Sequence, residues 1–262
     1  MQMKVEGQKI ASLTCYDYLF AKILERAGVD LILVGDSLGQ VVLGYDSTLP
    51  VTLDDMIRHA SAVRRGAPET FLVVDLPFLS YQVSAEEAVR NAGTILKETG
   101  AQAVKLEGGD PRTVETARRI VEAGIPVQGH LGLTPQSVHA LGGYRVQGRD
   151  EESAKRLLAE AKALEEAGIF SLVLELVPGP LARQVSEALV IPTIGIGAGA
   201  GCDGQVLVLP DAVGMNPDFQ PRFLKVYAEL HRAASEGIEA YVREVRDGDF
   251  PGPEHTIGGR QG

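Results

Sequence analysis

Three acidic residues each follow directly on a short apolar run. Asp36 follows LILVG, Asp75 follows FLVV, and Glu107 closes AVKLE. A carboxylate beside such a run is costly unless a partner or a metal ion compensates its charge. Carboxylate oxygens are ligands that Mg²⁺ prefers. If the runs are neighbouring strands, the acids converge and predict a magnesium site. The structural alternative is that they cap nearby helix N-termini.

A lysine stands two residues before the third acid. Because side chains alternate along a strand, Lys105 and Glu107 would point to the same face. Three roles for Lys105 remain open at this stage. It would bind a substrate carboxylate as a point charge, form a Schiff base as a desolvated lysine, or pair structurally with a neighbouring acid.

Two further side chains have the chemistry of proton transfer. Glu175 ends the run SLVLE, and a carboxylate near a metal but not bound to it suits a general base. A capping or salt-bridged acid is the alternative. His130 lies in the sequence GHLG and is interpreted as a catalytic residue, a substrate contact or a buried core donor.

The elements that must position these residues follow a repeated pattern. Amphipathic stretches end in a glycine, and an apolar run begins at once, as at Gly28, Gly100, Gly124 and Gly168. Near-continuous apolar runs are typical of strands that are covered on both faces. We expect strands near 10–15, 31–35, 70–74, 102–106, 125–129, 169–174, 192–196 and 205–209.

Eight such strands alternating with helices predict an α/β fold, a (β/α)₈ or TIM barrel in a single domain. An open, doubly wound sheet is the alternative, because alternation alone does not show closure. We assign 1–245 to the catalytic barrel domain and 246–262, rich in Gly and Pro, to a C-terminal tail. In parallel α/β architectures functional groups gather at the carboxyl ends of the strands, where all the candidates lie.

Composition excludes several classes of protein. The chain has 25 Lys and Arg residues against 35 Asp and Glu residues, and its formal charge of −10 disfavours nucleic-acid binding, which relies on clustered Lys and Arg. Cys15 and Cys202 have no CxxC spacing, so we expect neither a disulfide framework nor a structural zinc site. The sequence has no long apolar stretch, so we expect no membrane association and a cytoplasmic location.

Two loops are further candidates for a functional role. The glycine cluster 195–201 follows the expected seventh strand, where many barrels bind phosphate, although tight turns explain it equally well. The connection 131–149 is the longest between a strand and its helix, and its position suggests a functional lid.

Six motifs in order resemble the 3-methyl-2-oxobutanoate hydroxymethyltransferase family, also called the ketopantoate hydroxymethyltransferase family. The resemblance covers about residues 8–245. Its motifs are GDSLGQVVLGYDSTLPVTLDDM (35–56), DLPFLSY (75–81), VKLEGG (104–109), QGHLGLTPQSVHALGGYRVQG (128–148), LVLELVP (172–178) and IGIGAGAGCDGQVLV (194–208). The stretch 200–202 and Pro210 depart from the commoner residues of the family.

The resemblance implies a barrel of the phosphoenolpyruvate-mutase kind that uses Mg²⁺. The implied reaction is the first step of pantothenate biosynthesis, in which 5,10-methylenetetrahydrofolate gives a one-carbon unit to 3-methyl-2-oxobutanoate and 2-dehydropantoate forms. A homo-oligomer is also implied, as a decamer of two pentamers, with a small 2-oxo acid and a folate as its partners.

Roles are carried over residue by residue. The family's metal ligands fall on Asp36, Asp75 and Glu107. Its substrate contacts fall on Asp36, Ser37, Asp75 and Lys105. Glu175 matches the proton acceptor, and His130 matches an active-site histidine; together with Lys105 they form the expected catalytic set. The rival hypotheses are a related Mg²⁺-dependent 2-oxo acid lyase or mutase, a metal-free Schiff-base aldolase, and a catalytically inert barrel that serves as a binding module.

Overall fold

A computed structural model describes residues 1–140, 142–143 and 145–257. The chain divides into two compact units, Met1–Leu209 and Pro210–Gly262. The assignment of 1–245 to the catalytic domain and of 246–262 to a tail stays a prediction. Residues 258–262 of that tail lie outside the described part of the chain, as do positions 141 and 144 of the long connection 131–149.

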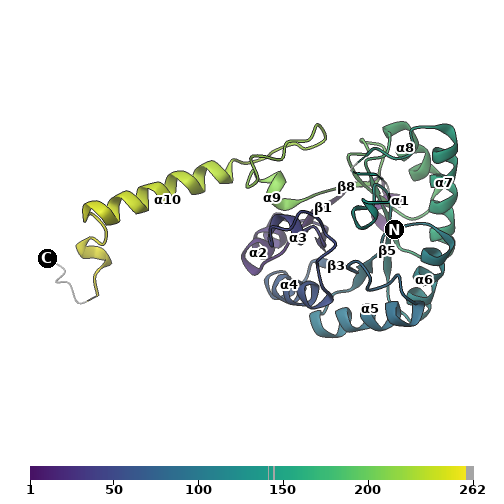
Figure 1. Ribbon diagram of the computed structural model, residues 1–262, viewed down its shortest axis with the longest axis horizontal. Helices are drawn as coiled ribbons and strands as arrows, with labels where there is room; N and C mark the ends of the chain where they lie inside the picture. The colour runs from purple at the N-terminus through teal and green to yellow at the C-terminus, as the bar shows by residue number, and fades with distance from the viewer. Residues whose placement is uncertain (141, 144, 258–262) are drawn as a thin grey trace. The chain divides into compact units, whose positions relative to one another are not determined.

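The first unit is a closed barrel of eight parallel strands, each paired with its neighbours in sequence order (Figure 1). This confirms the (β/α)₈ prediction over the open sheet. The strands are β1 (Ile10–Thr14), β2 (Leu31–Val34), β3 (Phe71–Asp75), β4 (Ala103–Lys105), β5 (Val127–Gly132), β6 (Ser171–Glu175), β7 (Thr193–Ile196) and β8 (Gly204–Leu207). Strand β5 ends later than expected, so His130 lies inside it.

Helices surround the strands (Figure 1). The helices and the 3₁₀ turn of this unit are α1 (Gln2–Val5), α2 (Tyr18–Ala27), α3 (Leu38–Val41), α4 (Leu53–Gly66), α5 (Ala85–Thr99), α6 (Pro111–Glu122), η1 (Pro135–Ser137), α7 (Glu151–Glu166) and α8 (Gly179–Ala188). Their ends follow local chemistry. The Thr52 side chain accepts from the Asp55 backbone N–H and the Asp55 carboxylate accepts in return, which starts α4. Gly100 ends α5 with a left-handed φ of 73°.

The packing of the barrel sets the direction of the functional side chains. Leu31, Leu33, Val73 and Ala103 form one buried apolar cluster, and burying a side chain of the size of leucine contributes about 1.5–3 kcal/mol. Because side chains alternate along a strand, Asp75 lies on the same face of β3 as Val73, and Lys105 lies on the same face of β4 as Ala103. The apolar cluster therefore fixes which way both charged side chains point.

The second unit holds most of α9 (Leu209–Ala212), which begins at the last residue of the first unit, followed by α10 (Leu230–Asp247) and the 3₁₀ turn η2 (Pro253–His255). The Tyr241 and Phe250 rings pack edge to face with centroids 5.7 Å apart, which holds the segment after α10 against that helix. Among the described residues of both units, no helix has the length and apolar character needed to cross a membrane.

Candidate active site

The predicted functional residues lie at or just beyond the carboxyl ends of strands β2, β3, β4 and β6, and His130 lies in the carboxyl-terminal half of β5. Asp75 and Lys105 are the last residues of β3 and β4, and they are direct partners in the strand register. Glu175 is the last residue of β6 and pairs in register with Gly132 of β5. The expectation that these side chains gather at one end of the barrel is confirmed.

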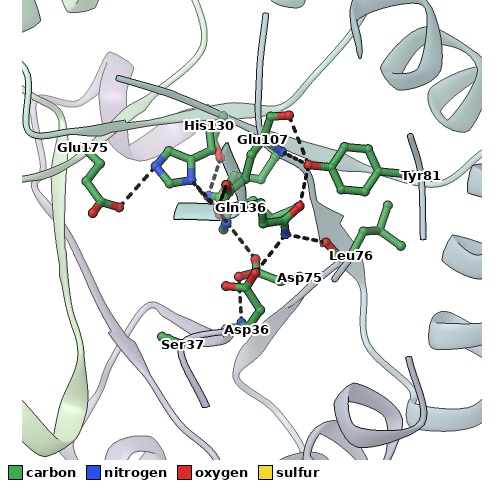
Figure 2. Close-up of polar contacts among 12 residues, drawn as sticks. Asp36, Ser37, Asp75, Leu76, Tyr81, Glu107, His130, Gln136 and Glu175 are labelled. Carbon is green, nitrogen blue, oxygen red and sulfur yellow. Dashed lines mark hydrogen bonds and ion pairs between the residues drawn. The ribbon is translucent and has the colours of Figure 1, made fainter. Parts of the chain in front are cut away.

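Five of them form a continuous series of ionic contacts. Lys105 Nζ lies 2.9 Å from Asp75 Oδ1 and 3.7 Å from Glu107 Oε1. His130 Nδ1 lies 3.3 Å from the same Glu107 oxygen, and His130 Nε2 lies 3.3 Å from Glu175 Oε2 (Figure 2). The Glu175 side chain is 20% exposed, against 3–4% for the other four. Glu175 is therefore the member of the series that incoming molecules reach most easily.

Asp36 and Ser37 join the site from the loop after β2. The Asp36 backbone N–H donates to Asp75 Oδ2 at 3.0 Å, and Ser37 Oγ lies 2.8 Å from the hydroxyl of Tyr16. A Cβ atom on Gly35 would stand 2.8 Å from Ser37 Oγ and 3.4 Å from Asp75 Oδ2. Glycine at position 35 thus lets the loop bring Ser37 and Asp75 together.

The acids nearest this loop carry poorly compensated charge. Burial raises the pKa of the Asp36 carboxyl well above its ordinary range, and the charges of Asp75 and Glu107 raise it further. Burial also raises the pKa of Asp75, although the Lys105 ammonium opposes this rise. This side of the site is therefore short of positive charge.

The other side of the site is better balanced. Burial and the Lys105 ammonium oppose protonation of His130, yet its contacts with Glu107 and Glu175 raise its pKa to about 9. Burial disfavours ionised Glu107 too, but the hydrogen bond and charge of His130, followed by Lys105, lower its pKa overall. Burial alone would lower the pKa of Lys105, but the surrounding acids, Asp75 first, raise it, so the amine stays protonated.

The donor set suits a hard divalent cation. Over the described ranges, no group of three or more His, Cys, Asp or Glu side chains is already arranged to hold a metal ion. The contacts give the reason, since Lys105 lies against Asp75 and Glu107 while Gln136 binds Asp36 and Glu107. The raised pKa values of Asp36 and Asp75 nevertheless mark oxygens whose charge a cation would stabilise. The residues present therefore fit Mg²⁺.

Two residues of the site were not among the predicted ones. Gln136 of η1 donates from its backbone N–H to Glu107 Oε2 at 3.0 Å and from its side-chain nitrogen to Asp36 Oδ2 at 2.9 Å. The Tyr81 hydroxyl donates to Gln136 Oε1 at 2.8 Å and accepts from the Glu107 backbone N–H at 3.1 Å (Figure 2). Both lie in motifs of the family, but neither has the charge or spacing that would have marked it as functional.

The glycine cluster 195–201, which begins inside β7, is explained by close packing and tight turns. A Cβ atom on Gly201 would lie 2.8 Å from the Cβ of Arg183, and one on Gly195 would lie 3.0 Å from Cys202 Sγ. Gly197 and Gly199 have left-handed φ values of 62° and 79°. Tight turns and close neighbours thus account for the four glycines.

Comparison with solved structures agrees with the barrel fold. Solved structures with the same fold include 2,3-dimethylmalate lyase, a PEP mutase/isocitrate lyase superfamily member (TM-score 0.62, 18% identity, covering 94% of this chain and 86% of that one). Another is phosphonopyruvate hydrolase in complex with oxalate and Mg²⁺ (TM-score 0.62, 13% identity, covering 96% and 89%). At such identities the likeness shows the fold.

Other known proteins have a much higher sequence identity to this chain. The chain is 59% identical over 254 residues to the 3-methyl-2-oxobutanoate hydroxymethyltransferase of Pseudothermotoga lettingae, covering 97% of this chain and 96% of that protein. It is 55% identical over 256 residues to the enzyme of the same name from Syntrophotalea carbinolica, covering 98% and 96%. Residues 1–253 match the model of the family described as ketopantoate hydroxymethyltransferase. The chain therefore belongs to the ketopantoate hydroxymethyltransferase family.

Proposed function

We propose that this chain transfers a one-carbon unit from 5,10-methylenetetrahydrofolate to 3-methyl-2-oxobutanoate and so forms 2-dehydropantoate, the first step of pantothenate biosynthesis. The observation that carries the proposal is the continuous contact series from Asp75 to Glu175, in a chain that matches the family over nearly its whole length. Relatives that carry this activity in their names are 55–59% identical to it.

The cofactor in this proposal is Mg²⁺, held by Asp36, Asp75 and Glu107. When bound, the ion would supply Lewis-acid chemistry that makes the C3 proton of the oxo acid more acidic. Asp36 and Asp75 also face the substrate, together with Ser37 and Lys105. Ser37 is positioned for this role by the 2.8 Å contact with the Tyr16 hydroxyl.

Lys105 acts through its charge. Its ammonium keeps its proton because the acids around it raise its pKa. A protonated amine at the barrel end binds a substrate carboxylate and offsets the negative charge that develops as the C3 proton leaves. The same protonation disfavours the Schiff-base alternative, in which the amine must attack a carbonyl as a neutral nucleophile.

Glu175 takes the C3 proton. It is the most exposed carboxylate of the contact series, and its Oε2 lies 3.3 Å from His130 Nε2. His130 in turn contacts Glu107, so it links the base to the acid that we assign to the metal. His130 thereby orients Glu175 toward the substrate.

Transfer of the one-carbon unit follows the loss of the C3 proton. Carbon C3, after loss of its proton, attacks the methylene carbon of the folate, so a C–C bond forms. The two C–N bonds between that carbon and the folate break, and one water supplies the hydroxyl group. The proton taken from C3 and the second hydrogen of the water go to the two folate nitrogens. The products are 2-dehydropantoate and tetrahydrofolate.

A direct assay tests the proposal. Purified protein with Mg²⁺, 3-methyl-2-oxobutanoate and 5,10-methylenetetrahydrofolate should form 2-dehydropantoate. In D₂O without folate it should exchange the C3 proton of the oxo acid, and exchange should stop in EDTA. Cleavage of a C–C or C–P bond in another 2-oxo acid, with no 2-dehydropantoate formed, would identify a lyase or mutase instead.

We further propose, from the family resemblance, that the protein works in the cytoplasm as a homodecamer of two pentamers. Sedimentation equilibrium at several protein concentrations tests the assembly. A particle of one or two subunits at all concentrations would contradict it.

A further inference from the structure

A second feature of the barrel unit lies beside the proposed base. A cavity of about 660 Å³ is lined by the segment that leads into α7, by the first turns of that helix and by the residue after Glu175. The lining residues that matter here are Arg145, Gln147, Arg149, Arg156 and Leu176. No residue of the proposed catalytic or metal set is among them.

The cavity carries a surplus of positive charge. Over the described residues, neither Arg145 nor Arg149 forms an ion pair, and Arg156 only approaches Glu160, at 4.0 Å and with 68% of its side chain exposed. The one acid in the lining, Asp150, is engaged at the start of α7, where its carboxylate accepts from the backbone N–H and the hydroxyl of Ser153. Three guanidinium groups around one hollow repel one another, and an anion would relieve that repulsion.

This positive region is unusual for the chain, whose formal charge is −10. Guanidinium groups offer paired donors that match carboxylate oxygens, so the arginines suit a ligand with several carboxylates. Such a ligand would be attracted here and repelled by most of the remaining surface.

One wall of the cavity is formed by a residue that is next in sequence to the proposed base. Leu176 directly follows Glu175, and its carbonyl accepts from the Gln147 backbone N–H at 3.0 Å. Leu176 has a left-handed φ of 47°, which a leucine rarely adopts, so the surrounding structure must hold this turn. Gly148 is also close-packed, since a Cβ atom there would lie 2.5 Å from Leu181 Cδ2 of α8. The segment that carries Arg145 and Arg149 is therefore fixed against β6 and α8.

We propose that this cavity binds the glutamate tail of the folate donor, with Arg145, Arg149 and Arg156 contacting its carboxylates. The inference rests on the proposed function, which places the one-carbon end of the folate at Glu175. The carboxylates of a folate lie at the opposite end of the molecule from the reacting carbon. A donor that reacts beside Glu175 thus extends its tail past Leu176 into the arginine cavity.

Equilibrium binding tests the proposal without any turnover. Calorimetry compares tetrahydrofolate carrying one glutamate with the form carrying three. Because exposed ion pairs are individually weak, we expect the wild-type protein to bind the triglutamate about fivefold to tenfold more tightly. The double variant Arg145→Gln/Arg149→Gln should lose most of this preference. The preference should also shrink when the salt concentration rises from 50 to 500 mM.

A matched control removes the same charge elsewhere. Arg58→Gln/Arg65→Gln changes two exposed arginines of α4, which does not line the cavity, and it should keep the full preference for the triglutamate. Equal affinity of the wild type for the two folates, an unchanged preference in the cavity variant, or an equal loss in the control would each overturn the inference. Failure of the proposed function has a different signature, namely no 2-dehydropantoate from either form of the donor.

Discussion

The side-chain amide of Gln136 donates to Asp36 Oδ2 at 2.9 Å, although 100 positions of sequence separate the two residues. The same amide nitrogen donates to the Leu76 carbonyl at 2.9 Å, and the Gln136 backbone N–H binds Glu107. One buried glutamine thus connects the loops after β2, β3 and β4. Two of the acids that we assign to the metal are therefore positioned by a residue that is itself uncharged.

Gln136→Leu tests this connection. The substitution leaves the buried carboxylate of Asp36 and the hydroxyl of Tyr81 without these partners, so we expect the free energy of unfolding to fall by about 1–3 kcal/mol. The affinity for Mg²⁺ and the rate of C3 exchange should fall as well. Urea denaturation and a magnesium titration measure the two effects.

Gln82→Leu is the matched control. Gln82 is exposed, and its side chain donates to the same Gln136 Oε1 at 3.1 Å. Its removal should change the stability by less than about 0.5 kcal/mol, as for most surface substitutions. Equal losses in the two variants would mean that the contact with Asp36 has no special weight.

The sequence predicted where Asp75, Lys105 and Glu175 would lie, because each of them is tied to a strand; their roles stay predictions. Asp75, Lys105 and Glu175 end apolar runs, and alternation along a strand fixes the face on which each lies. The closed barrel then brings those faces together. This part of the site depends on local pattern alone, which is why it was predictable.

Gln136 and Tyr81 could not be predicted in the same way. Tyr81 lies in a loop and Gln136 in the short 3₁₀ turn η1, where no periodicity fixes the direction of a side chain, and their contact joins positions 55 residues apart. The arginine cavity is a similar case, since it depends on how the segment before α7 folds back against Leu176. Long-range loop packing is set by the completed barrel, which a linear pattern does not describe.

The crowding of charge around Asp36 predicts opposite effects of one substitution. Asp36→Asn removes a buried charge that Asp75 and Glu107 repel. We therefore expect the metal-free protein to gain roughly 1 kcal/mol in free energy of unfolding. The same variant should lose the stabilisation that Mg²⁺ gives the wild type, because a ligand oxygen has lost its charge.

Denaturation in EDTA and in excess Mg²⁺ separates these two effects. Asp54→Asn, an exposed change in the first turn of α4, is the control and should respond to Mg²⁺ as the wild type does. If Asp36→Asn were as strongly stabilised by Mg²⁺ as the wild type, Asp36 would not be a ligand.

The buried thiol of Cys15 predicts a pH dependence of stability. Burial raises its pKa from 9.0 to about 11, because the thiolate is poorly solvated there. A pKa that is higher in the folded than in the unfolded state gives stability that is complete below pH 9 and is lost as the pH rises through 11. At about 1.4 kcal/mol per pKa unit, the loss approaches 3 kcal/mol.

Cys15→Ala isolates this contribution, because it removes the thiol and leaves the other titrating groups in place. Urea denaturation between pH 8 and 11 should show the wild type losing stability faster than the variant. Parallel curves would indicate that the thiol is not desolvated in the folded protein.

The charge of Lys105 predicts that no covalent intermediate forms on it. The amine is protonated and lies 2.9 Å from Asp75 Oδ1. Incubation with the oxo acid and borohydride should therefore leave Lys105 unmodified in a peptide mass map. Lys105→Met should weaken binding of the oxo acid, and it should leave the buried charge of Asp75 without its ion-pair partner. Reductive trapping at Lys105, with full activity in EDTA, would support the aldolase alternative.

Glu175→Gln gives the sharpest test of the base. The amide has the size of the carboxylate and can accept a hydrogen bond from His130, so the fold and the affinity for Mg²⁺ should persist. Exchange of the C3 proton in D₂O should fall by about 10²–10⁴-fold, the usual contribution of a general base.

Glu166→Gln, an exposed change at the end of α7, is the matched control and should exchange at the wild-type rate. Because the assay needs no folate, it separates proton removal from one-carbon transfer. Exchange at an undiminished rate in Glu175→Gln would assign the proton to another group, and His130, whose Nε2 lies 3.3 Å from Glu175, would be the next residue to substitute.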